Sequence, residues 1–425
     1  MATTRGSAER EDDVSDAGDP GRRYDLYGDA FKRDPHVTFA AMRREAPIHK
    51  QAGLDGETPI WFVTRYADVD AMLRDKRFVR DERLAKDEAD RYVWTPLEHR
   101  INEQMLNRDG QDHRRLRDLV AQGFTPKRVA DLRPRVEAIA QEFLAHVRDA
   151  AQRSGGVADL ITEFSFPLPT TVILEMLGIP VQDRDRFRAW GNALLAPPMS
   201  KEAQEESLRH LTDFADYLDA LFEERRARPR GDLVSALVAA EQEGDRLSPQ
   251  ELSSTLVLLI VAGHETTVNL IANGVLQLSR RPELRDALAA DPSGLPGMVE
   301  ELVRYDGSVE RALNRWAAED VAWDGRVIRR GEPVILILGS ANRDHEAFED
   351  PEAFDPARSP NRHLGFGKGV HYCMGAPLAR LETEIALRTL LTNLPKLRVA
   401  VPEEELRYRF LPGFRALEAL PVTWG

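Results

Sequence analysis

The sequence predicts a mainly α-helical protein with a smaller β portion. Long stretches such as 129–151 and 208–227 repeat apolar residues at intervals of three and four, the period of a helix that packs on one side. Short β-branched or apolar runs broken by turn residues lie near each end, at 59–66 and 326–342. These two patterns together indicate a helical body with a small sheet region.

Composition limits the function classes. The chain has 71 acidic and 58 basic residues and a net charge of -13, which does not support nucleic-acid binding as its main role. We find no apolar run that approaches the ~20 residues of a membrane-spanning helix, and the N-terminus lacks the apolar core of a signal peptide. We therefore expect a cytoplasmic protein that binds neither nucleic acid nor membrane.

The chain is expected to form one large domain. Residues 1–23 are polar and acidic, which is typical of a flexible tail. No Gly/Ser-rich or Pro-rich linker divides residues 24–425. We therefore predict a tail at 1–23 and a single catalytic domain at 24–425.

The best-defined helix begins after Ser248. Ser248 is a suitable N-cap, Pro249 suits the first helical position, Glu251 completes a capping box, and Pro282 marks the far limit. About 32 residues at 1.5 Å each would span ~48 Å, the width of a whole domain. We expect this helix to cross the centre of the protein.

The middle of that helix carries an unusual polar segment. The apolar run 256–262 gives way to Gly263, Glu265 and Thr266 within "AGHETT". Glycine and threonine are poor helix residues, and threonine hydroxyls compete for backbone carbonyls. A local opening beside a ligand and a simple kink with satisfied hydrogen bonds explain this segment equally well.

The chain contains a single cysteine, Cys373, within "FGKGVHYCMG". One cysteine cannot form an internal disulfide, a Cys-rich zinc site or a four-thiolate cluster. A buried structural residue, a reactive thiol and a single thiolate ligand remain possible.

The surroundings of Cys373 favour the ligand. Residues 374–391 have helical periodicity, so Cys373 would lie just before a helix N-terminus, where we expect the thiol pKa to fall. Gly367, Gly369 and Gly375 allow the backbone to approach a flat partner. Such a thiolate suits the axial position of haem iron. The alternative is a buried cysteine in a glycine-rich loop.

These segments resemble the cytochrome P-450 monooxygenases. The cysteine loop is similar to the family's haem loop at six positions: Phe366, Gly367, Gly369, His371, Cys373 and Gly375. "AGHETT" resembles the family's oxygen-activating helix, with Ala262 and Gly263 beside the haem and with Glu265 and Thr266 as the acid and alcohol of a proton relay. The resemblance covers residues 24–425.

Further motifs extend the resemblance. "EELVR" supplies a Glu-x-x-Arg motif at Glu301 and Arg304, and "FDPAR" supplies their expected partner Arg358. The resemblance implies that the haem propionates are bound by His113 and Arg117 of "HRRLR", by Arg315 and by His371. Without the resemblance, Glu301 and Arg304 would be interpreted as an ordinary ion pair on a helix surface. The other basic residues would be interpreted as solvated side chains or as members of ion pairs.

The resemblance is nearest to the soluble bacterial branch that includes macrolide hydroxylases. It departs at Gly110 and Gln111, where relatives often have two prolines, so the shape of this loop is open. The segment "LLAPPMSKEAQ" at 194–204 is the expected hinge of the helix pair that covers the substrate.

The resemblance implies an oxidoreductase that binds haem b (iron protoporphyrin IX), with Cys373 as the iron ligand and the haem between the long central helix and the cysteine loop. It would insert one atom of O₂ into a C–H bond or an alkene, in a reaction typical of secondary metabolism. Electrons would come from a ferredoxin or flavodoxin with its reductase. Basic residues that could form the docking face are Arg114, Arg115, Arg362, Lys368 and Arg380.

The expected substrate is a bulky, mostly apolar small molecule, such as a macrolide, another polyketide or a steroid-like ring system. The residues expected to line its pocket are Tyr92, Trp94, Val309, Ala312, Leu313, Leu411 and Phe414. Tyr92 and Trp94 would either face the substrate, including a polar appendage such as an amino sugar, or pack their loop onto the core.

Two other functions stay open. A peroxygenase of the same fold would use H₂O₂ directly, but it usually lacks an acid and alcohol pair like Glu265 and Thr266. A haem-based gas sensor or binding protein would usually carry a signalling domain.

Overall fold

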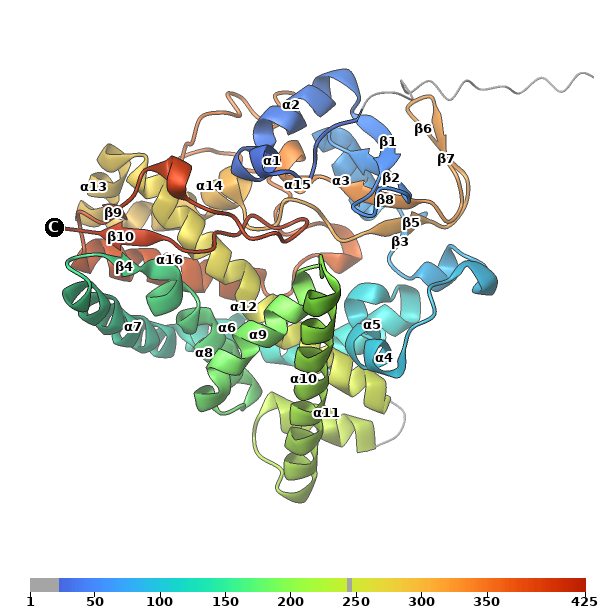
Figure 1. Cartoon of the computed structure of the whole chain (residues 1–425), viewed down its shortest axis with the longest axis horizontal. Helices are drawn as coiled ribbons and strands as arrows, with labels where there is room; N and C mark the ends of the chain where they lie inside the picture. The colour runs from blue at the N-terminus through green and yellow to red at the C-terminus, as the bar shows by residue number, and fades with distance from the viewer. Residues whose placement is uncertain (1–22, 243–246) are drawn as a thin grey trace, which may run out of the picture.

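The computed structural model describes residues 23–242 and 247–425. The predicted tail at 1–23 lies outside these residues except for Arg23. Helices make up most of the structure, and small sheets lie at its edges (Figure 1). The expected mainly α fold with a smaller β portion is confirmed.

The longest helix, α12, spans Pro249–Ser279 and has 31 residues. The Ser248 hydroxyl accepts from the Glu251 amide at 3.1 Å, and the Glu251 carboxylate accepts from the Ser248 amide at 2.9 Å, so the predicted capping box is present. In Figure 1, α12 runs diagonally through the middle of the molecule. By length and composition α12 could cross a membrane, contrary to our reading of the sequence, yet 72% of its apolar window is buried inside the protein. α12 is therefore a core helix that is mostly buried inside the protein.

The other helices surround α12. Near the N-terminus they are α1 (Asp29–Arg33), α2 (Pro35–Glu45), α3 (Tyr66–Arg74), α4 (Pro96–Asn102), α5 (Gly110–Ala121), α6 (Pro126–Asp131) and α7 (Arg133–Arg153). The middle of the chain forms η5 (Ile161–Ser165), α8 (Pro167–Leu177), α9 (Arg184–Leu195), α10 (Lys201–Ala227) and α11 (Leu233–Gln242). Those after α12 are α13 (Pro282–Ala290), α14 (Leu295–Asp306), α15 (Leu338–Ala341) and α16 (Ala376–Asn393).

The main sheet has five strands in the order β1-β2-β8-β5-β3. They are β1 (Ile48–Ala52), β2 (Pro59–Val63), β8 (Pro333–Leu336), β5 (Arg315–Ala317) and β3 (Phe78–Val79). β2 and β8 pair in parallel, with Trp61 opposite Val334, so strands from both ends of the chain meet in one sheet. β5 pairs antiparallel with β8, with Arg315 opposite Val334, and Arg315 is buried.

Two smaller sheets complete the β portion. One has the order β4-β10-β9, from β4 (Ala158–Asp159), β10 (Pro421–Thr423) and β9 (Arg398–Val399). The other is the hairpin of β6 (Val321–Trp323) and β7 (Arg326–Ile328). The first ties the C-terminus to the helical region, near α7 and α16 in Figure 1.

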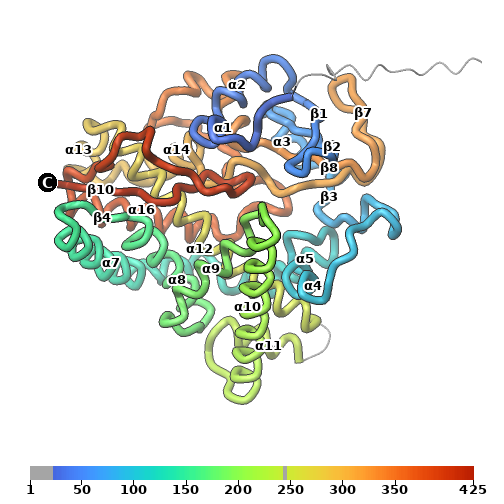
Figure 2. The backbone as a smooth tube through the Cα atoms, in the orientation of Figure 1, coloured from blue at the N-terminus to red at the C-terminus, as the bar shows by residue number. Residues whose placement is uncertain are grey.

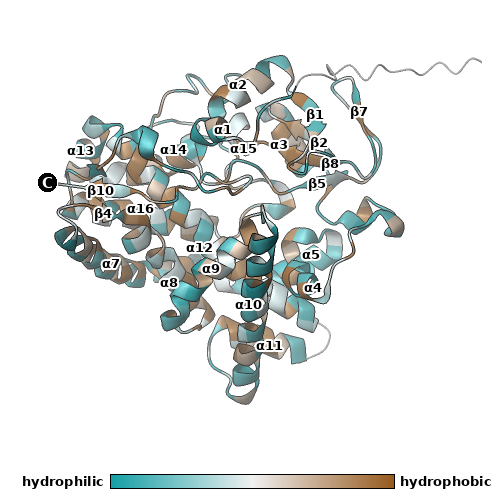
Figure 3. Ribbon diagram, in the orientation of Figure 1, coloured by the Kyte–Doolittle hydropathy of each residue, from teal (hydrophilic) through white to brown (hydrophobic). Residues whose placement is uncertain are grey.

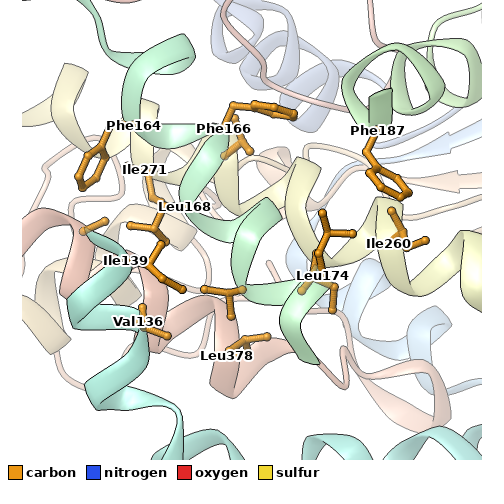
Figure 4. Close-up of a cluster of buried hydrophobic side chains, with 14 of the residues drawn as sticks. Val136, Ile139, Phe164, Phe166, Leu168, Leu174, Phe187, Ile260, Ile271 and Leu378 are labelled. Carbon is orange, nitrogen blue, oxygen red and sulfur yellow. The ribbon is translucent and has the colours of Figure 1, made fainter. Parts of the chain in front are cut away.

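Apolar side chains from four helices meet around α12. Figure 4 shows them spread along α8 between the surrounding helices, and the labelled members from these helices are Val136 and Ile139 of α7, Leu168 and Leu174 of α8, Ile260 and Ile271 of α12, and Leu378 of α16. All are 3% exposed or less. Burial of such side chains stabilises a fold by ~1.5–3 kcal/mol each, so this cluster holds α12 rigidly against its neighbours.

The helix pair α9 and α10 packs on the outer side of this core, and Phe187 and Trp190 of α9 and Phe214 of α10 are buried in the same cluster. The two helices are joined by residues 196–200, as the prolines of the predicted hinge suggested, and Ser200 caps α10 by accepting from the Ala203 amide. In the tube view the pair stands in front of α12 (Figure 2). The visible face of α10 is largely hydrophilic (Figure 3). Solvent therefore borders this side of the pair.

Candidate active site

The cysteine loop joins the sheet region to α16. Gly367 and Gly369 have φ angles of 68° and 71°, a conformation that other residues rarely adopt. The Cys373 amide donates to the Phe366 carbonyl at 2.9 Å, which closes the loop. Gly375 has an ordinary φ, but a Cβ there would lie 3.9 Å from Cys373 Sγ. The loop thus presents an accessible thiol on a backbone held in a tight turn.

The expectation that the Cys373 pKa falls is wrong. Burial among protein groups is the dominant influence and raises the pKa, although the amides of Gly375 and Ala376 and the Arg117 guanidinium act in the opposite direction. The position before α16 is as predicted, but the helix terminus does not outweigh desolvation. Coordination to a metal deprotonates a thiol outright, so a bound metal would favour the thiolate despite this burial.

The middle of α12 is partly accessible, at residues 258, 261–263 and 266, whereas most of the helix is buried. Leu258, Ala262 and Thr266 recur at intervals of four, so they share one helix face, the accessible stripe, and all three are accessible to solvent. The intervening Ile260 and Glu265 are buried. Small and polar side chains therefore border a space beside the centre of α12.

Gly263 packs closely against α8. A Cβ at this position would lie 2.7 Å from Cγ1 of Ile173 on α8. The glycine is thus explained by the close approach of α8, while Ala262 lies on the accessible stripe. Gly263 is also partly accessible, so its predicted place beside the haem stays a prediction.

The acid and the alcohol at the centre of α12 point in different directions. The Thr266 hydroxyl donates to the Ala262 carbonyl at 3.2 Å and stays on the accessible stripe. The Glu265 carboxylate is buried and ion-paired to Arg409. Nothing in the local sequence marks Arg409, which lies 144 residues away, as its partner.

Several basic side chains gather between α5, β5 and the cysteine loop. The rings of His113 and His371 lie 4.4 Å apart, and Arg117 donates to the Tyr372 carbonyl at 2.8 Å. Arg315 is 5% exposed and donates to the Phe78 carbonyl at 3.2 Å. The structure thus brings together all four residues that the sequence assigned to propionate binding.

This basic cluster has few acidic partners. Burial lowers the pKa of Arg315, and burial together with the nearby His371 and Arg117 lowers that of His113 to about 4. Within the described residues, Arg315 Nε and His371 Nδ1 have no hydrogen-bond partner. Buried donors in this state are suited to bind carboxylates supplied by a ligand.

One acidic residue that the sequence did not reveal organises the cluster. Asp109 accepts from His371 Nε2 at 2.9 Å and from the Asp81 amide at 2.8 Å. Burial would raise the pKa of Asp109, but these hydrogen bonds hold it at about 2. The next residue, Gly110, has a φ of 61°. Proline cannot adopt this angle, which explains why the chain departs from the two-proline pattern.

Glu301, Arg304 and Arg358 form a buried network on α14 and the segment that follows β8. Arg304 donates to both carboxylate oxygens of Glu301, at 2.7 and 2.8 Å, and Arg358 Nε lies 3.3 Å from each of them. Burial alone would raise the pKa of Glu301, but its partners hold it below its usual value. The sequence could not have identified this network from the Glu-x-x-Arg spacing alone, because exposed pairs share that spacing.

Comparison with known proteins settles the family. The family model for cytochrome P450 matches residues 54–291 and 295–405, which is most of the chain. The protein belongs to the cytochrome P450 family. It is therefore a haem-binding monooxygenase.

Individual relatives cover nearly the whole cytochrome P450 chain. The protein is 42% identical to the cytochrome P450 monooxygenase PikC of Streptomyces venezuelae, over 93% of this chain and 92% of PikC. It is 43% identical to the mycinamicin IV hydroxylase/epoxidase of Micromonospora griseorubida, over 91% and 94% of the two chains. The crystal structure of myxobacterial cytochrome P450 CYP267B1 in complex with myristic acid superimposes with a TM-score of 0.88 and 41% identity, covering 94% of this chain and 98% of that one.

The residues of this cytochrome P450 fit its cofactor. Haem carries a metal and two carboxylates, and the site offers one accessible thiol and a set of buried donors that lack partners within the described residues. The thiol thus suits the haem iron, and the buried donors suit the two haem carboxylates.

The predicted pocket residues fall into two groups. Val309 and Phe414 face each other in an isolated β-bridge, and Leu313 is 48% exposed although it is apolar. Leu411 is 1% exposed, and its carbonyl accepts from Lys32. Ala312 packs against the core of the sheet region.

The other group lies in the segment around α4. Tyr92 is 63% exposed and donates to Glu98 at 2.9 Å, while the Trp94 ring packs edge-on against His99. These contacts lie within the segment itself, so they support neither a substrate contact nor the packing of this loop onto the core. The structure does not place Tyr92 in an enclosed environment.

Proposed function

We propose that this cytochrome P450 hydroxylates or epoxidises a bulky apolar natural product, such as a macrolide, another polyketide or a steroid-like compound. The observation that carries the proposal is that the cysteine loop exposes its one cysteine and that α12 exposes Ala262 and Thr266 although most of α12 is buried. The name of the mycinamicin IV hydroxylase/epoxidase supports hydroxylation or epoxidation of a complex natural product. The apolar side chains of Val309, Leu313 and Phe414 suit such a molecule, because burial of apolar surface contributes ~25 cal/mol per Å².

We propose separate sets of residues for the haem iron and for the two haem carboxylates. Cys373 binds the iron, and Phe366, Gly367, Gly369 and Gly375 shape the loop around it. His113, Arg117, Arg315 and His371 bind the two carboxylates. When bound, thiolate-ligated haem supplies the chemistry that cleaves the O–O bond.

The protein's own contribution to the reaction is proton supply and positioning. Thr266 holds its hydroxyl on the accessible stripe, where it can pass protons toward the reacting oxygen. Glu265 is the acid that brings these protons from solvent. Ala262 leaves space for the substrate, while Glu301, Arg304 and Arg358 keep the cysteine loop in place.

Electrons come from a separate ferredoxin or flavodoxin with its reductase. Of the five basic residues predicted to form the docking face, Arg115, Lys368 and Arg380 are ion-paired to Glu251, Asp70 and Glu300. Arg114 and Arg362 are exposed. Exposed cations on this side are suited to steer an acidic partner. We place this system in the cytoplasm, with residues 24–425 as one catalytic domain.

Substrate binding and turnover test this proposal. A macrolide, a steroid, a long-chain fatty acid and a small monoterpene are titrated against the ferric protein, and displacement of iron-bound water is followed by absorbance. The large-ring compounds should bind more tightly and be oxidised. Tighter binding and oxidation of the fatty acid or the monoterpene would refute the large-ring assignment.

The electron source separates this function from its alternative. We expect product from O₂ with a ferredoxin, its reductase and a nicotinamide nucleotide. Product from H₂O₂ alone, at equal or higher rate, would identify a peroxygenase. Failure to oxidise any compound in either mode would favour a haem-binding protein without catalytic activity.

A further inference from the structure

Arg80 is a second buried arginine beside Arg315. It directly follows β3, which pairs antiparallel with β5 so that Val79 lies opposite Trp316. The next residues along this register are Arg80 and Arg315, and they are 6% and 5% exposed. Like charges that lie directly opposite each other on neighbouring strands are destabilising. The fold therefore holds two cations side by side where water screens them poorly.

The hydrogen-bond donors of Arg80 are directed at neutral oxygens. Its Nε donates to the Leu106 carbonyl at 2.8 Å. Its two terminal nitrogens donate to the Asn314 carbonyl and to Oδ1 of Asn107. These bonds hold the guanidinium in one place, but uncharged acceptors do not neutralise it. Arg80 therefore acts on its surroundings mainly as a fixed positive charge.

Asp109 is the carboxylate that acts on both arginines. Its Oδ2 accepts from the Arg80 amide at 2.5 Å. Burial and the charge of Arg315 nevertheless lower the pKa of Arg80 to about 9, against the influence of Asp109, and burial lowers the pKa of Arg315. Two guanidinium groups and one carboxylate leave one positive charge in excess. A buried charge is costly unless it is paired, so this site favours a further anion.

Two neighbouring acidic residues are engaged by another arginine. Asp81 accepts from Arg83 at 2.6 and 2.8 Å, and Asp112 lies 3.2 Å from the same guanidinium. The Arg83 side chain is 47% exposed, so solvent screens its charge, and the two carboxylates already match it. Arg83 lies close to Arg80 in the chain and provides a matched control for it.

We propose that Arg80 and Arg315 form a paired cationic site for one haem carboxylate, in which Arg315 donates the hydrogen bond and Arg80 supplies the charge that the carboxylate neutralises. The inference rests on the proposed binding of a haem carboxylate by Arg315. Nε of Arg315 lacks a partner within the described residues and is the donor available to the cofactor. Arg80 acts through its charge, so it is a positioning residue and not a ligand of the haem.

Two properties of the bound haem report this charge. A carboxylate that neutralises a buried cation is held more tightly, so loss of the charge should speed the release of haem. Reduction of haem adds an electron, and a nearby cation stabilises the reduced form, so loss of the charge should also lower the reduction potential. A residue that only supports the fold would leave the potential unchanged.

The variants are Arg80→Met, Arg80→Gln and Arg80→Lys, with Arg83→Met as the matched control. Release of haem to apomyoglobin should be about tenfold faster in the two neutral variants, which corresponds to ~1.4 kcal/mol. Arg80→Gln keeps part of the hydrogen bonding and serves as the neutral variant if Arg80→Met does not fold. Arg80→Lys keeps the charge but loses the planar fork, and it should release haem at close to the wild-type rate, as should Arg83→Met.

The reduction potential, measured by redox titration of the holoenzyme, tests the charge directly. We expect the potential to fall in Arg80→Gln, to rise in Asp109→Asn, and to return close to the wild-type value in the double variant Arg80→Gln/Asp109→Asn. Losses of opposite charges cancel in this way, whereas losses of packing would not. An unchanged potential in Arg80→Gln, an equal effect of Arg80→Lys and Arg80→Gln, or a double variant that stays as low as Arg80→Gln would overturn the role of Arg80.

These measurements do not depend on turnover, so they separate this inference from the proposed function. If Arg315→Leu does not release haem faster than the wild type, the proposed carboxylate contact and the role of Arg80 are both wrong. If Arg315→Leu releases haem faster but the neutral Arg80 variants behave like Arg83→Met, only the role of Arg80 is wrong.

Discussion

Arg304 donates hydrogen bonds to both carboxylate oxygens of Glu301, at 2.7 and 2.8 Å, and neither side chain is exposed to solvent. Removal of one partner from a buried ion pair leaves an unpaired charge and costs ~3–5 kcal/mol. We expect Glu301→Gln to lower the free energy of unfolding by this amount in urea denaturation. The exposed variant Arg362→Ala should change it by less than ~0.5 kcal/mol. Equal stabilities of the two variants would contradict the buried network.

Cys373 is predicted to be the iron ligand. Cys373→Ser should abolish the thiolate-type absorption band of the reduced carbon monoxide complex, because oxygen cannot replace the electron donation of sulfur. The neighbouring variant Tyr372→Phe, which keeps the thiol, should retain the band. A Cys373→Ser protein that still shows the band would exclude this assignment.

Thr266 is predicted to be needed for orderly proton delivery and not for haem binding. Thr266→Ala should still consume reductant and O₂, while the yield of product per reductant falls by roughly tenfold or more and peroxide rises. Thr266→Ser keeps the hydroxyl and should preserve coupling. Unchanged coupling in Thr266→Ala would assign the role to water or to Thr267.

Arg315 is predicted to bind a haem propionate. Its guanidinium is buried, and Nε has no partner within the described residues. A hydrogen bond to a charged group contributes ~1.5–3 kcal/mol, so Arg315→Leu should release haem to apomyoglobin about 10 to 100 times faster. The partly exposed Arg77, which pairs with Asp75, provides the control Arg77→Ala. Equal rates of haem release from Arg315→Leu and Arg77→Ala would contradict a contact between Arg315 and a haem propionate.

Glu300 is predicted to contribute to the acid sensitivity of the fold. Burial would raise its pKa, but hydrogen bonds to His363 at 3.1 Å and Arg380 at 2.6 Å hold the pKa at about 2. Because this value is below the ~4.3 of an unfolded chain, the stabilisation is complete above about pH 4 and is lost as the pH falls toward 2.

Glu300→Gln should therefore reduce stability at pH 7 and flatten its dependence between about pH 4 and 2. The carboxylate is partly exposed, and solvent screening limits the effect to less than ~1 kcal/mol. Urea denaturation at several pH values measures it. If the slope of stability against pH in this range is the same in Glu300→Gln as in the wild type, other carboxylates determine the acid sensitivity of the fold.

Much of the fold followed from local sequence. The capping box of Ser248 and Glu251 predicted the start of α12, and the prolines at 197 and 198 marked the break between α9 and α10. The stretch 129–151 was less well predicted, because the chain forms α6 and α7 with a break at Leu132. Caps and breaks depend on neighbouring residues, whereas periodicity alone does not show where a helix is interrupted.

The site was predicted as a set of residues but not as an arrangement. His113, His371 and Arg315 were all identified, and the structure brings them together. Asp109, which accepts from His371, was missed because an aspartate before a helix is usually only a cap. Arg409 was missed because its partner is distant in the chain.

The sequence by itself determined the family, through one cysteine in a glycine-rich loop and a polar break in a long apolar helix. Only the tertiary structure decided the direction of the Cys373 pKa shift, the contact of Gly263 with Ile173, and the pairing of Glu265 with Arg409. The physical reason is that desolvation and ion pairing depend on all the groups packed around a side chain. Most of these groups come from segments that only the folded chain brings together.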